Sequence, residues 1–241
     1  QGARVTVGDS PSFGSARSVL DSIGALAELQ RLDVPVVEFR QTKQVLLPCG
    51  HKAPLAAAAL DCDMLVNLPK VKAHSQMRLT VAVKNYFGCV AGLHKPWWHM
   101  VHGSRQGLFA ELLLDLLKVL PSGYSLVDGI VAMHRTGPVH GVSYPLGIVA
   151  AGTNPVAVDT ALMVLLGIEP LHCPLWRTAH GAGFQGTDVE KLIFPLMRPA
   201  ALAVDDFVVP EALGPVRFNL LRFVNNSMKR MVLRLRQRDD G

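Results

Sequence analysis

Residues 146–166 read LGIVAAGTNPVAVDTALMVLL, and this stretch decides the class of fold. The apolar run 146–151 has the length and composition of a buried strand. Asn154 can cap the helix that follows, and Gly167 can end it. A strand that leads directly into an apolar helix is the repeating unit of α/β proteins.

The same alternation extends over most of the chain. Strands are expected at residues 3–8, 34–39, 44–47, 63–68, 124–131 and 146–151, and helices at 16–31, 54–60, 80–90, 105–120 and 155–166. This order predicts a three-layer α/β domain over residues 1–215, with a mostly parallel or mixed sheet flanked by helices. Because the first strand opens at residue 3 with no element before it, we expect the domain to lack its first βα unit.

Composition excludes several classes of protein. With 49% hydrophobic residues among 241, the chain is not intrinsically disordered. Its four cysteines form no C-x-x-C pair, so neither a zinc ribbon nor an iron–sulfur cluster is predicted, and a reducing compartment is expected. No leader peptide and no apolar stretch of about 18 residues is visible. We therefore expect a cytoplasmic location.

The positive charge of the chain belongs to its C-terminal end. The net charge is +5, but residues 217–238 hold seven basic side chains and no acid, leaving 17 basic against 19 acidic residues elsewhere. A body of this balance does not favour nucleic-acid binding. Within 216–241 the apolar residues recur at steps of three and four: Leu221, Val224, Met228, Met231 and Leu235. This spacing predicts a basic amphipathic helix that packs on the domain, on a second subunit or on an anionic membrane.

The densest group of polar residues follows the expected strand 63–68. Residues 67–74 read NLPKVKAH and residues 80–85 read TVAVKN. Open α/β sheets bind ligands where their strands end, and the positive field of Lys70, Lys72 and Lys84 suits a carboxylate or a phosphate. The alternative is a solvated loop whose lysines extend into water. Lys84 fits that alternative poorly, because apolar residues surround it on a predicted helix.

This group of residues predicts a small-molecule enzyme, and each residue can be given a role in it. An imidazole titrates near pH 6.5, so His74 can act as acid or base, with Asp128 or Asp159 nearby. The candidate catalytic residues are His74, Lys84 and Asp128, and the candidate substrate-binding residues are Lys70, Lys72, Asn85, Ser10 and Asp159. Ser10 belongs to a strand-to-helix turn of the kind that holds anions. Asp159, on an apolar helix, needs a lysine or backbone donors as partners.

Two other classes of function remain open. The first is a metal-dependent enzyme that uses His94, His99 and His102, although H-x-x-H spacing is common and no acidic residue lies nearby. Trp97 and Trp98, between these histidines, fit an aromatic lid or plain packing. The second is a non-catalytic ligand-binding or redox-partner module, for which a shallow basic surface with unperturbed pKa values is expected. The reaction, any cofactor and the oligomeric state are not predicted.

Five segments in this order resemble one known family. They are GDSP at 8–11, VNLPKVKAH at 66–74, VKNYFGCV at 83–90 followed by Gly92 and Lys95, VDGIVAM at 127–133 followed by Gly137, and AGTNPVAVD at 151–159. The chain is similar to the domain-of-unknown-function family 362, whose members are often labelled iron–sulfur-centre proteins. The family usually has a further N-terminal βα segment, a glutamate where this chain has His134, and appended cluster-binding cysteines. The resemblance therefore implies an association with iron–sulfur proteins but no cluster in this chain.

Overall fold

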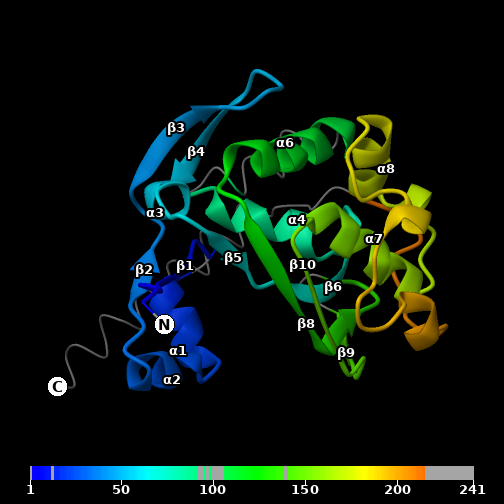
Figure 1. Cartoon of the computed structure of the whole chain (residues 1–241), viewed down its shortest axis with the longest axis horizontal. Coiled ribbons are helices and arrows are strands. Elements are labelled where there is room, and N and C mark those ends of the chain that lie inside the picture. The colour runs from blue at the N-terminus through cyan, green and yellow to red at the C-terminus, as the bar shows by residue number, and fades with distance from the viewer. Residues whose placement is uncertain are drawn as a thin grey trace.

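The computed structural model describes residues 2–11, 14–91, 95, 98, 106–137 and 141–214. The N-terminal part is a small lobe in which β1 (Val7–Asp9) pairs in parallel with β2 (Val36–Glu38) beside α1 (Ala16–Ser22) and α2 (Ala25–Arg31). It lies at the lower left of Figure 1. The single helix predicted over 16–31 is divided, because Gly24 between the two helices has a φ of 75°.

The larger part is built on a six-stranded mixed sheet, so the predicted α/β class is confirmed. The long central strand is β8 (Gly123–His134). It pairs in parallel with β5 and β6 and antiparallel with β9 and β10, and β6 pairs with β7. The bounds are β5 Leu65–Asn67, β6 Lys70–His74, β7 Arg78–Thr80, β9 Val142–Tyr144 and β10 Ile148–Gly152.

Helices divide the interior into two cores. In one, α7 (Pro155–Leu165) packs on sheet residues such as Val71 and Val127. In the other, α6 (Gln106–Val119) packs on the hairpin of β3 (Thr42–Leu46) and β4 (Lys52–Ala56). Part of the helix predicted over 54–60 is therefore strand, and only α3 (Ala57–Leu60) is helical. Between the cores lies α4 (Ala82–Asn85), followed by the 3₁₀ turn η1 (Tyr86–Cys89) and, later in the chain, α8 (Pro174–Gly181).

The residues that follow Pro69 form a strand, which gives Lys70 and Lys72 a different position from the one expected. The strand predicted to end before Pro69 resumes at Lys70, so β5 and β6 run one after the other beside β8. The Pro69 carbonyl still accepts a hydrogen bond of 2.8 Å from the Asp128 amide of β8. Lys70 and Lys72 therefore lie on a strand, where none was expected: Lys70 pairs with Asp128 in the middle of β8 and Lys72 with Met133 near its carboxyl end.

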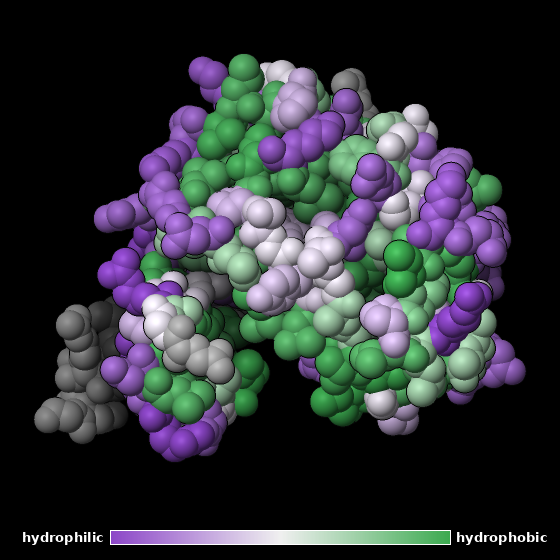
Figure 2. All heavy atoms as spheres, in the orientation of Figure 1, coloured by the Kyte–Doolittle hydropathy of each residue, from purple (hydrophilic) through white to green (hydrophobic). Residues whose placement is uncertain are grey.

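Side chains alternate along β8 between the core and one exposed face. Ser125 and Val127 are buried beneath the helices, whereas Tyr124, Leu126 and Ile130 are exposed. The surface where β8 and β9 end is largely apolar in Figure 2. None of the helices in the described ranges is both long enough and apolar enough to cross a bilayer.

Candidate functional site

Three lysines gather between α4, β6 and the tip of β1. Burial, and then the charges of Lys72 and Lys95, lower the pKa of Lys84 to about 8. Burial likewise lowers the pKa of Lys95 to about 8, although Asp9 opposes the shift. The pKa of Lys72 is lowered by burial first and by Lys70 second. We call Lys72, Lys84 and Lys95 the lysine cluster.

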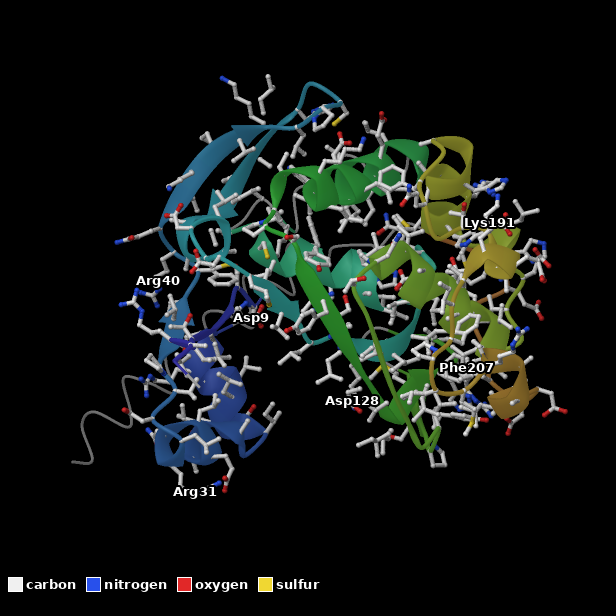
Figure 3. All side chains as sticks on the ribbon, in the orientation of Figure 1. Asp9, Arg31, Arg40, Asp128, Lys191 and Phe207 are labelled. Carbon is white, nitrogen blue, oxygen red and sulfur yellow. The ribbon has the colours of Figure 1, made fainter. Side chains whose placement is uncertain are left out.

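The cluster joins the two lobes. The Lys95 ammonium donates hydrogen bonds to the Ser10 carbonyl and, at 3.0 Å, to the Gly88 carbonyl. The Lys84 ammonium lies 6.0 Å from the centre of the Phe87 ring. Figure 3 shows Asp9 at the end of β1, on the side of the small lobe that faces the sheet. Asp9 and Lys95 were not among the predicted site residues, although both belong to segments that carry the family resemblance.

The positive charge of the cluster is not neutralised by ion pairs. Within the described ranges, no carboxylate lies within ion-pair distance of Lys72, Lys84 or Lys95. Lys70 differs, because its ammonium lies 2.5 Å from the Asp128 carboxylate and holds the pKa of that carboxyl below its usual range. Lys72 and Lys84 are half-buried and Lys95 is buried, and lysines so placed without carboxylate partners can attract an external anion.

The carboxylate of Asp159 fixes the helix that carries Lys84. Asp159 lies on α7, is buried, and accepts hydrogen bonds from the backbone amides of Ala82 (2.7 Å) and Val83 (3.3 Å). Burial raises its pKa to about 7, against the opposing effect of these two hydrogen bonds. The prediction that Asp159 needs a partner is confirmed. Because both carboxylate oxygens face backbone donors, we assign Asp159 the positioning of α4, whereas the sequence predicted contact with a substrate.

Asn67, which was not predicted as a functional residue, joins three segments below the cluster. Its amide nitrogen donates to the Ala82 carbonyl (3.0 Å) and to the Ser125 hydroxyl (2.9 Å). Its amide oxygen accepts a 2.7 Å hydrogen bond from Asn85. The side chain of Asn85, predicted to bind substrate, is thus held by Asn67.

We expect Asn67→Ala to lower the free energy of unfolding by about 1.5 kcal/mol, because it leaves buried polar groups without partners. Urea denaturation at pH 7 measures the change. Asn85→Ala is the matched control: it removes one of the same hydrogen bonds from an exposed residue, and we expect a loss below about 0.7 kcal/mol. Equal losses in the two variants would contradict the proposed role of Asn67.

Two of the histidines singled out in the sequence, His74 and His134, lie away from an open site. His74 is 1% exposed, and its Nδ1 accepts hydrogen bonds from the amides of Gln76 (3.1 Å) and Met77 (3.2 Å) in the turn between β6 and β7. Nδ1 of His74 therefore stabilises this turn. His134 packs against the rings of Tyr144 and Phe207 at the end of β8, at centroid distances of 5.1 and 5.8 Å.

A carboxylate of the chain itself, that of Glu38, already occupies the N-terminus of α1 that follows the turn after β1. The Ala16 and Arg17 amides at the start of α1 donate to the Glu38 carboxylate at 3.0 and 3.1 Å. Burial, the largest single influence, raises the pKa of Glu38, but these hydrogen bonds, the charge of Arg40 and a hydrogen bond with Ser15 together outweigh it, so the pKa is lowered. The Ser10 amide donates to the Asp9 carboxylate at 2.7 Å, so the part of Ser10 that faces the lysine cluster is its carbonyl.

A cavity of about 320 Å³ is lined in part by Tyr86, which follows Lys84 by two residues in the sequence, but the cavity is separate from the lysine cluster. Its wall includes Tyr86, Leu117, Asn154 and Phe184, and none of the three lysines lines it. Burial raises the pKa of Tyr86, and a hydrogen bond with Ser125 opposes this shift. The largely apolar cavity is therefore distinct from the charged site, and the candidate acid–base and anion-binding groups lie at the lysine cluster.

Several predictions fall on residues that the structure does not describe. They concern the candidate metal ligands His94, His99 and His102, the side chain of Trp97, and the helix expected over 216–241. Trp98 is described: it is buried and its ring lies 5.9 Å from that of Phe87, which favours packing over a lid. Within the described ranges, no three His, Cys, Asp or Glu side chains are arranged to hold a metal ion.

Comparison with known proteins supports the resemblance seen in the sequence. A family model described as a domain of unknown function (DUF362) matches residues 1–163. The thylakoid-associated protein sll1697 of Synechocystis sp. is 38% identical over 234 residues, which cover 97% of this chain and 73% of that protein. No solved structure matches significantly. Because the matched region contains all five segments that carry the resemblance, the chain belongs to the DUF362 family.

Proposed function

We propose that the chain is an enzyme that binds a small anionic substrate, a carboxylate or a phosphate, at the lysine cluster. The observation that carries this proposal is the cluster itself, in which Lys95 is buried and Lys72 and Lys84 are half-buried, with two lysine pKa values near 8 and no carboxylate paired to it in the described ranges. In such a site Lys72 and Lys95 hold the anion. Lys84 moves a proton, because a lysine with a pKa near 8 is about one-tenth unprotonated at pH 7.

This assignment shifts acid–base chemistry from His74 to Lys84. Nδ1 of His74 is engaged with two backbone amides, and the side chain is buried. The Lys70–Asp128 pair flanks the cluster on β6 and β8, where Asp128 keeps the charge of Lys70 from adding fully to the field. The alternative, a non-catalytic module beside an iron–sulfur protein, predicts ordinary lysine pKa values.

The test is an NMR titration of the lysine side chains, in the absence and presence of inorganic phosphate. We expect one resonance, absent in Lys84→Met, to titrate near pH 8 and to move upward by at least about one pH unit with phosphate, because a bound anion stabilises the ammonium. Calorimetry should show phosphate binding that Lys72→Met weakens by about tenfold. Lys52→Met, at an exposed position on β4, is the control. Ordinary titration of Lys84, or equal binding in all variants, would refute the proposal.

We propose, as a second property, peripheral contact with an anionic membrane. The relative named a thylakoid-associated protein supports it, together with the seven basic residues of 217–238. Vesicle binding that weakens as salt is added is the expected signature of the tail. The cytoplasmic location and the association with iron–sulfur proteins stay predictions, and a second subunit stays the alternative partner of residues 216–241.

A further inference from the structure

The two most exposed large apolar side chains of the described ranges, Ile193 and Leu196, lie in one loop. Residues 191–198 read KLIFPLMR, and the exposed fractions are 89% for Ile193, 97% for Leu196 and 58% for Met197. Single exposed leucines are common on protein surfaces, whereas several adjacent ones mark a contact surface. Basic residues, Lys191 and Arg198, stand at both ends of this segment.

The loop is held at both ends, so its apolar side chains are presented from a defined backbone. On one side is the turn η3 (Val189–Lys191), where the Asp188 side chain accepts a 3.2 Å hydrogen bond from the Glu190 amide. On the other side, η4 (Pro199–Leu202) begins at a buried proline. Between them Leu192 and Phe194 are half-buried and turn inward, whereas Ile193 turns out. Figure 3 shows Lys191 at the edge of the molecule opposite the small lobe.

We infer that this loop inserts Ile193, Leu196 and Met197 into the interfacial layer of a lipid bilayer. The inference rests on the proposed membrane contact and names the described part of the chain that makes it. A single loop is too small for a stable protein interface, which takes about 800 Å² from each partner. Lipid tails need no complementary shape, so a few projecting apolar side chains can enter them. Lys191 and Arg198 can extend to the headgroups.

Charge distinguishes this loop from the basic tail. Lys191 pairs with Asp188 at 2.9 Å, and Glu190 lies beside them, so residues 188–198 carry as many acidic as basic side chains. Attraction to anionic lipids contributes little to such a segment, and insertion depends on apolar burial. Binding through the loop should therefore persist at high salt, unlike binding through residues 217–238.

Co-sedimentation of the full chain with vesicles of phosphatidylglycerol and phosphatidylcholine in equal parts tests the inference. We expect Leu196→Asp to weaken partitioning by at least about tenfold at both 0.05 and 0.5 M NaCl, because a carboxylate replaces an inserted side chain. The control is Ile23→Asp, which places the same charge at a 68% exposed position of the small lobe and should change partitioning less than about twofold. Phosphate binding should be unchanged in both variants.

The other outcomes separate the two membrane proposals. If the wild-type chain binds no vesicles, both the membrane contact and the loop inference fail. If Leu196→Asp binds as well as the wild-type chain and salt removes the binding, the tail makes the contact and the loop inference alone is overturned. Equal losses of vesicle partitioning in Leu196→Asp and Ile23→Asp would also overturn the loop inference, since a negative charge would then weaken binding equally outside the loop.

Discussion

Lys84→Met is expected to raise the free energy of unfolding at pH 7 by about 2 kcal/mol, in phosphate-free buffer, while it removes anion binding. The pKa of Lys84 falls from 10.5 to about 8 on folding, so protonating this side chain is harder in the folded chain than in the unfolded one. The penalty is absent above pH 10.5, grows as pH falls towards 8, and is complete at pH 7. We reduce the full conversion of the shift, about 3.4 kcal/mol, because the side chain keeps some contact with water.

Urea denaturation of Lys84→Met and the wild-type chain measures this gain. Methionine keeps the packing of the lysine stem against Phe87 and removes only the ammonium. The exposed control Lys52→Met should change stability by less than about 0.5 kcal/mol. A variant of Lys84 that is less stable than the wild-type chain would show that the ammonium already has a partner. A gain in stability with a loss of binding is typical of a residue kept for function.

Asp159→Asn is expected to remove a pH dependence of stability from the wild-type chain. The pKa of Asp159 is raised from 3.8 to about 7 in the folded state, so the folded chain binds a proton more tightly than the unfolded chain does. This contribution is fully present below pH 3.8 and is lost as pH rises through 7. Between pH 5 and pH 8 the free energy of unfolding of the wild-type chain should fall by about 2.5 kcal/mol through this group, and the asparagine variant should not show this fall.

Denaturation curves at pH 5, 6, 7 and 8 measure the difference between the two chains. Asp128→Asn serves as the control, because the pKa of Asp128 is lowered by Lys70 and its contribution is lost only below about pH 4. Its curve should run parallel to that of the wild-type chain over this range. A parallel curve for Asp159→Asn as well would mean that the carboxyl is not desolvated as the structure indicates.

Local sequence signals predicted the parts of the fold whose causes are local. Asn154 caps α7 by accepting from the Val156 and Ala157 amides, as its position before Pro155 indicates. The partner of Asp159 was predicted because an unpaired buried carboxylate is costly wherever it lies. Which donors it meets was not predicted, because the backbone amides of α4 are not visible as a motif.

The errors arose where long-range pairing overrides local preference. No strand was expected over Lys70–His74, since Pro69 precedes it and lysine is not a strand former, yet pairing with β8 makes it a strand. The alternation of half-buried Lys70 and Lys72 with buried Val71 and Ala73 was the signal that could have shown this strand. Lys95 and Asp9 join the site only through tertiary contacts between the two lobes.

The bond between Asp159 and the start of α4 also orders the events of synthesis. Asp159 follows Ala82 by 77 residues, so a ribosome that adds about 5 to 20 residues per second needs about 4 to 15 seconds to pass from one to the other. Lys72, Lys84 and Lys95 are all made before Asp159, and until then α4 has no carboxylate at its first amides. We therefore expect Lys84 to reach its folded position only after Asp159 has been made and α7 has docked.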